Sequence, residues 1–177
     1  MQKGDYACVS VPWLKKKLFG LTVYVPNILG YLIRLFTWSR YDHAFIYIGN
    51  GKIIEAQPRG AVISDLTKYK YDKLQVSTTV LNSGERKIIT TQAQKYIGTP
   101  YGFLDIFYLW LSILGFKWEW LLDKVESENR LICSQLVALC GYYASVDEWL
   151  CGKDNACKVI PKNLANLAAK ATYYKGE

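Results

Sequence analysis

The chain has 177 residues, of which 51% are hydrophobic and 15% aromatic, a composition that excludes a mainly disordered protein. Its 22 Lys and Arg outnumber its 15 Asp and Glu, giving a formal net charge of +7. That charge favours an anionic partner, such as a membrane surface, a cell-wall polymer or a nucleic acid. No repeat or low-complexity linker divides the chain, so we expect one domain over 1–177.

The expected elements follow from apolar periodicity and from turn residues. In chain order they are strands at 4–11, 43–48, 52–57 and 73–81, with helices at 26–36, 84–98 and 129–146 and a last helix that Pro161 begins within 159–170. For the helix at 129–146 the expected cap is Ser127 or Asn129.

Two apolar segments, 11–38 and 102–122, elaborate this domain. Prolines and glycines interrupt the first, and the uncharged run of the second has 11 residues. A transmembrane helix needs about 20. We expect core packing for 102–122 in preference to membrane docking, while contact of either segment with a membrane surface stays open.

The cysteines are odd in number, which argues against a disulfide framework and for a reducing compartment; they are Cys8, Cys133, Cys140, Cys151 and Cys157. The last two could form a local disulfide if oxidised. Because the chain has no CxxC spacing and a single histidine, we expect no metal site and no cofactor.

Cys133 and the single histidine, His43, are the candidate reactive residues. Cys133 lies about four residues into its expected helix, where backbone N–H groups still face outward. A helix N-terminus and a nearby imidazole favour a thiolate, which is the nucleophilic form of cysteine. Cys140, two turns further on, is expected to be a core thiol.

The imidazole needs a third group to orient it, and the hairpin after His43 offers Glu55 and Gln57. A plain two-residue turn at Asn50 and Gly51 would place Glu55 on the face opposite His43. A three-residue loop at 49–51, with Gly51 left-handed in a bulge, would pair 45 with 55 and 43 with 57. We expect the second register, which puts both candidates on the face of His43.

The chain contains, in this order, "GD" near its start, "SRYDHAFIYIGNGKIIEA", "RGAVISDLTKY", "YIGTPYGFLD", "NRLICSQLV" and "VIPKNL". Together they resemble the circularly permuted branch of the NlpC-type papain-like superfamily, with its YiiX/YaeF-like proteins and, more distantly, lecithin–retinol acyltransferase relatives. In that branch the histidine strand precedes the cysteine helix, as it does in this chain. The resemblance implies an α+β fold, a permuted papain-like antiparallel sheet packed with helices.

Position by position, the resemblance makes Cys133 the nucleophile, His43 the general base and Glu55 the orienting residue. Tyr101, in "GTPYGF", matches a tyrosine near the cleft, and Gln57 is a further candidate there. The implied protein is a thiol-dependent amidase or peptidase that forms an acyl-enzyme on peptide or peptidoglycan-type amides.

Two alternatives stay open beside that hydrolase. A lipid-directed acyltransferase or lipase with the same residues is favoured by the two apolar segments, and a binding or structural module would leave the Cys–His pair incidental. Nucleic-acid binding has only the net charge and three lysines at 15–17 to support it, so solvated surface charge is preferred. No secretory signal is visible, which predicts a cytoplasmic or phage- or virus-associated protein of open oligomeric state.

Overall fold

The structure is a computed structural model that describes residues 1–70, 72–77, 79–103, 106–108, 111, 115–116, 130–146, 149, 159 and 161–173. The apolar segment 102–122 lies mostly outside these residues. The pair of cysteines at 151 and 157 lies wholly outside them.

A five-stranded antiparallel sheet forms the centre of the protein, in the order β6-β5-β4-β1-β7. Its strands are β1 Tyr6–Ser10, β4 His43–Gly49, β5 Lys52–Gln57, β6 Gly60–Asp65 and β7 Lys73–Val76. With the helices below, this sheet makes the protein α+β, as the sequence predicted.

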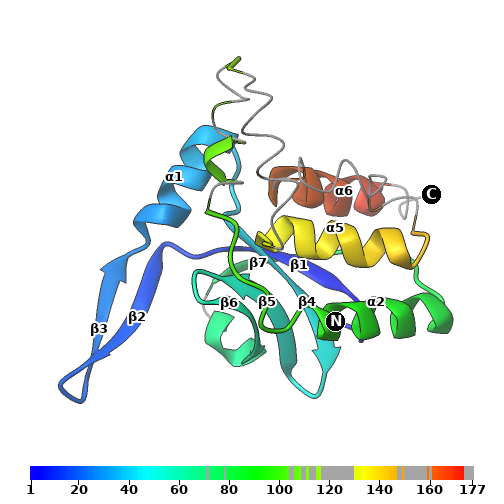
Figure 1. The fold of residues 1–177 in the computed structure, drawn as a ribbon, viewed down its shortest axis with the longest axis horizontal. Helices are drawn as coiled ribbons and strands as arrows, with labels where there is room; N and C mark the ends of the chain where they lie inside the picture. The colour runs from blue at the N-terminus through cyan, green and yellow to red at the C-terminus, as the bar shows by residue number, and fades with distance from the viewer. Residues whose placement is uncertain are drawn as a thin grey trace.

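Three helices pack against one face of the sheet (Figure 1). They are α2 Ser83–Lys95, α5 Cys133–Tyr143 and α6 Pro161–Tyr173. Strand side chains alternate between faces, so Cys8, Ala44, Ile46 and Ile54 enter the helix-covered core. Helix α5 lies at its centre, in contact with α2, β4 and β5.

The opposite face is covered by a short 3-10 helix, η1 Leu66–Tyr69. The ring of Tyr69 stacks on Phe45 with centroids 5.4 Å apart. Because Phe45 and His43 are two residues apart on β4, they share this second face. The imidazole therefore belongs to the η1 side of the sheet, near the end where β4 begins.

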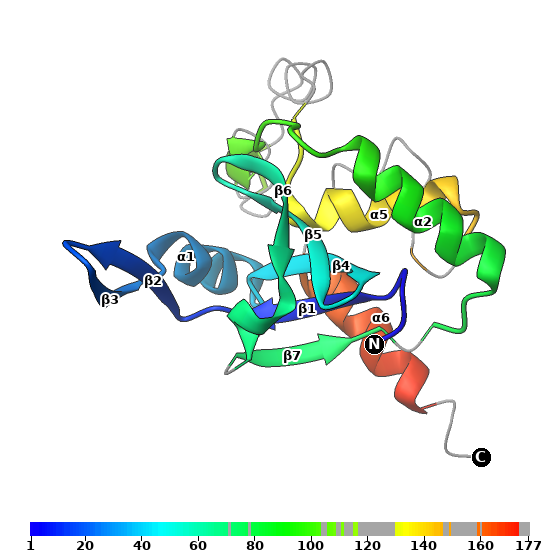
Figure 2. The ribbon, with the colours of Figure 1, turned by 90° about the horizontal axis from the view of Figure 1, so that it is seen from below.

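Residues 13–37 form an arm that projects from the body of the protein (Figures 1 and 2). The arm consists of the hairpin of β2 Trp13–Leu18 and β3 Leu21–Pro26, followed by α1 Ile28–Thr37. Asn27 caps α1 by accepting a hydrogen bond from the backbone N–H of Gly30 at 3.0 Å. The expected helix at 26–36 is confirmed, whereas the hairpin before it was not predicted.

Most predicted boundaries hold to within a few residues, and four further elements differ from the prediction. Strand β6 and helix η1 were not predicted, and the strand expected at 73–81 ends at Val76. The expected start of the cysteine helix at 129 is wrong, because residues 130–132 are not helical and the cap is Ile132. Both expected caps, Ser127 and Asn129, lie outside the described residues. The last helix begins at Pro161, as expected.

Within the part of the chain that the structure describes, no helix combines the length and the apolar character needed to cross a bilayer.

Candidate active site

The register of the β4–β5 hairpin places His43 and Glu55 on one face of the sheet. Ile46 pairs with Ile54 and Tyr47 with Ile53, which is the register that the site requires. The turn itself differs from the expectation. It is a two-residue turn at Asn50 and Gly51, both with positive φ, and a bulge between Tyr47 and Gly49 restores the register.

Glu55 holds the imidazole of His43 directly. Its Oε2 atom lies 2.7 Å from Nε2 of His43. Since that nitrogen is occupied by the carboxylate, the other ring nitrogen, Nδ1, is the one left for a reacting group.

Glu55 is fully buried, and three more side chains donate to its carboxylate. Lys68 Nζ and Gln57 Nε2 reach Oε1 at 2.5 and 2.7 Å, and the hydroxyl of Tyr69 reaches Oε2 at 2.5 Å. Burying a carboxylate destabilises the fold unless the charge is paired and hydrogen-bonded. These donors form hydrogen bonds with both of its oxygens.

Cys133 is the first residue of α5, at the end of the sheet where β4 begins. Its side chain is buried, and its proximity raises the pKa of the His43 imidazole. The chain thus brings together a thiol, an imidazole and a carboxylate from α5, β4 and β5. Cys140, by contrast, is fully buried in the core, where burial raises the pKa of its thiol.

The charges in this group support one another. Burial by itself lowers the pKa of His43, but Cys133 and Glu55 more than compensate and raise it to about 10. Burial likewise opposes ionisation of Glu55, yet the hydrogen bonds and charges of His43 and Lys68 hold the pKa of that carboxyl well below its ordinary value. The electrostatics therefore favour an imidazolium beside an ionised carboxylate.

The first turn of α5 carries no side-chain cap on its N–H groups, because the N-cap residue is Ile132. The cap's own backbone N–H donates to Oε1 of Gln135 at 2.8 Å. A helix N-terminus of this kind presents N–H groups and a partial positive charge to any anion beside Cys133.

The two further candidates lie at different places. Gln57 is joined to Glu55 and therefore belongs to the group around His43. Tyr101 is buried next to the N-terminus of α5. It forms a parallel bridge with Leu131, two residues before Cys133. The ring of Phe103 packs edge-on against that of Tyr101, with centroids 4.9 Å apart.

Two residues of the site were missed by sequence reasoning. Lys68 and Tyr69 lie on η1, an element that the sequence pattern did not reveal. Their signal was weak, since one lysine and one tyrosine in "SDLTKYK" look like ordinary surface residues.

Among the described residues, no group of three or more His, Cys, Asp or Glu side chains could hold a metal ion. A search with family models and a search of curated proteins both return no match to this chain.

Proposed function

We propose that the protein is a cysteine hydrolase that cleaves amides through an acyl-enzyme, with Cys133 as nucleophile, His43 as general base and acid, and Glu55 as the orienting residue. We propose further that its fold is a circularly permuted papain-like one. The observation that carries the proposal is the convergence of Cys133, His43 and Glu55, in which the buried carboxylate of Glu55 contacts Nε2 of the imidazole and Cys133 lies beside it.

In the first step the Cys133 sulfur attacks the amide carbonyl carbon, and the thiol proton resides on Nδ1 of His43. The carbonyl oxygen becomes an oxyanion, for which the backbone N–H groups at the start of α5 are the available donors. His43 then passes its proton to the leaving nitrogen as the C–N bond breaks.

In the second step water attacks the thioester, and His43 takes a proton from that water. The C–S bond breaks, and the carboxylic acid product and the free enzyme are released. Glu55 keeps its contact with Nε2 throughout, so that Nδ1 stays directed at the sulfur and the imidazolium is stabilised.

Peptide and peptidoglycan-type amides are the substrates we propose. The resemblance of the cysteine and histidine segments to the permuted NlpC-type superfamily, which most often implies an amidase or peptidase, supports this choice. The net charge of +7 suits an anionic wall polymer.

Replacement of the nucleophile gives the direct test. Cys133→Ala should lower the rate of muropeptide cleavage by at least about a thousandfold, because no other group can form the acyl-enzyme. The readout is product formation by mass spectrometry, together with a search for an acyl adduct on the Cys133 peptide of the wild type.

Cys140→Ala is the matched control, since it removes a second buried thiol from the same helix. It should leave the rate within a few-fold of wild type. Cleavage that survives Cys133→Ala but is lost in Cys140→Ala would contradict the assignment.

A lipid-directed acyltransferase or lipase is a second candidate, favoured by the exposed apolar side chains of the arm. The same chemistry would act on an ester. Release of fatty acid from phospholipid by the wild type, without any muropeptide cleavage, would favour this candidate.

A further inference from the structure

The arm of residues 13–37 and the adjoining Trp38 expose an unusual amount of apolar surface. Half of the exposed large hydrophobic side chains among the described residues, 11 of 22, lie between 13 and 38. Within 13–38 the largest exposed fractions are 96% for Phe19, 83% for Trp38 and 71% for Leu21. A concentration of this kind marks an interaction surface rather than scattered surface residues.

The tip of the hairpin presents an aromatic side chain on a strained backbone. Phe19 and Gly20 form the turn, and both have positive φ, 47° and 81°. Glycine or asparagine is the usual residue in such a turn, because a bulky side chain is strained there. The strained backbone and the almost fully exposed ring of this phenylalanine do not stabilise the fold, which indicates a role in binding.

Helix α1 directs an apolar stripe outward. Ile28, Tyr31, Leu32 and Leu35 follow helical spacing, and each is exposed. The opposite side of the helix holds the buried Gly30 against Asp42. The outward face of this helix is therefore apolar, whereas that of an ordinary surface helix is polar.

The charge of this region is of one sign. Residues 6–41 contain five Lys and Arg and no Asp or Glu; the five are Lys15, Lys16, Lys17, Arg34 and Arg40. Arg34 is paired with Asp42 at 3.4 Å, so the remaining positive charge belongs mainly to the three lysines of β2. A segment that combines exposed apolar side chains with net positive charge matches a surface that is anionic outside and apolar beneath.

We propose that the β2–β3 hairpin and α1 dock the protein on an anionic lipid bilayer. The Phe19 tip and the outward face of α1 enter the acyl boundary, and the β2 lysines meet the phosphate groups. The inference is independent of the proposed catalysis.

A lipid surface suits the arm better than a second protein surface does. Trp13 and Tyr24 lie on one face of the hairpin and Leu21 and Val23 on the other, and all four are exposed. A protein partner or a second copy would cover one face, whereas lipid surrounds an inserted tip on every side.

The arm is fixed firmly to the body beside the candidate active site. The carboxylate of Asp42 accepts from the backbone N–H of Val11 at 3.0 Å and pairs with Arg34 of α1. Asp42 directly precedes His43. Docking would therefore hold the start of β4 at a defined position relative to the membrane.

Vesicle flotation tests the proposal. The probes are vesicles of phosphatidylcholine with phosphatidylglycerol, and vesicles of phosphatidylcholine alone. The wild type should float with the first and bind the second at least tenfold more weakly. Phe19→Ser/Leu21→Ser should reduce binding to the anionic vesicles at least tenfold, and Lys15→Gln/Lys16→Gln/Lys17→Gln should reduce both the binding and its dependence on salt.

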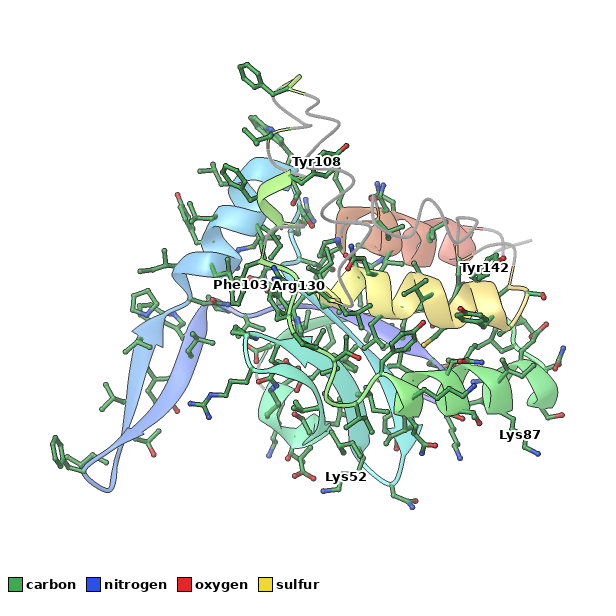
Figure 3. All side chains as sticks on the ribbon, viewed as in Figure 1. Lys52, Lys87, Phe103, Tyr108, Arg130 and Tyr142 are labelled. Carbon is green, nitrogen blue, oxygen red and sulfur yellow. The ribbon has the colours of Figure 1, made fainter. Side chains whose placement is uncertain are left out.

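Matched controls distinguish binding through the arm from non-specific hydrophobic or electrostatic binding by the rest of the surface. Val80→Ser/Ile97→Ser removes exposed apolar side chains elsewhere and should bind as the wild type does. Lys52→Gln/Lys87→Gln/Lys95→Gln removes three exposed charges; Lys52 and Lys87 lie away from the arm (Figure 3).

Three outcomes would overturn the proposal. They are wild-type protein that does not float, flotation unaffected by Phe19→Ser/Leu21→Ser, and a dimer in sedimentation velocity that this variant breaks while vesicle binding is absent. Cys133→Ala should float as the wild type does, so that failure of the proposed catalysis leaves the docking result readable.

Discussion

Glu55 has no exposed surface, and four side chains contact its two carboxylate oxygens. A carboxylate so deep in the protein stays ionised only because the imidazolium of His43 and the ammonium of Lys68 compensate for the lost hydration. At the scale of the residue, His43 and Glu55 are therefore interdependent.

Glu55→Gln should disturb His43 while nearly preserving the shape of the site. The amide carries no charge, so the pKa of His43 should fall and the imidazolium should be less populated. Amide cleavage should drop by at least about tenfold, by analogy with the orienting carboxylate of other triads. Asp65→Asn, which neutralises an exposed carboxylate on β6, is the control, and equal losses in the two variants would contradict the orienting role.

At the scale of the element, the hairpin turn determines which face Glu55 occupies. A plain turn at 50–51 would have put Glu55 on the wrong face, and the bulge between Tyr47 and Gly49 corrects the register by one residue. The register itself was predictable from the sequence, because glycine at 51 suits a bulged loop and because Glu55 must share the face of His43 to contact it. The position of the extra residue was not, since a bulge has no strong sequence signal.

Two glycines of this sheet should respond differently to alanine. Gly51 has φ +70° and open space around its added Cβ, so Gly51→Ala should cost about 1 kcal/mol of backbone strain. Gly60 has φ +109°, and an added Cβ would lie 2.9 Å from the carbonyl oxygen of Thr99. Gly60→Ala should therefore cost about 3 kcal/mol.

Urea unfolding of both variants measures these costs. Equal destabilisation by the two alanines would show that the contact between the β5–β6 turn and Thr99 is not rigid.

Helix α5 shows where sequence reasoning was limited. The pairing of Cys133 with a helix start was predictable, but the helix was expected to begin at 129 with a polar cap. Its N-cap is Ile132, a residue type that is rarely a cap, so the usual signal was absent. Likewise, the strands of the arm's hairpin lack the usual alternation of apolar and polar residues, because their apolar residues lie on both faces.

At the scale of the whole molecule, the His43–Glu55 pair makes stability depend on pH in two windows. The pKa of Glu55 is below its ordinary value of 4.5, so its contribution is complete above that pH and is lost as the pH falls through the folded value. The pKa of His43 is raised from 6.5 to about 10, so its contribution is complete below 6.5 and declines as the pH rises toward 10.

The free energy of unfolding should therefore be greatest between these windows. Urea titrations across the pH range measure it, and Glu55→Gln should flatten both slopes, because it removes one group and weakens the other. Wild-type and variant curves that run parallel at all pH values would contradict the coupling.

The protein combines a body that holds the Cys133 group and an arm that exposes apolar surface (Figure 2). The ion pair of Arg34 with Asp42, the residue before His43, joins the two. Buried polar contacts between segments far apart in the sequence stabilise the body. The exposed apolar surface of the arm needs a partner, for which we propose a lipid bilayer. These two parts can be tested separately, by cleavage assays and by flotation.

In the proposed site, Cys133, His43 and Glu55 form one electrostatic unit. Because His43 is the only histidine, the ring C–H signals of the imidazole can be followed by NMR across pH without assignment variants. We predict a midpoint near 10 in the wild type, well above the ordinary 6.5, and a clear fall in Cys133→Ala. A midpoint near 6.5 that Cys133→Ala does not move would contradict this coupling.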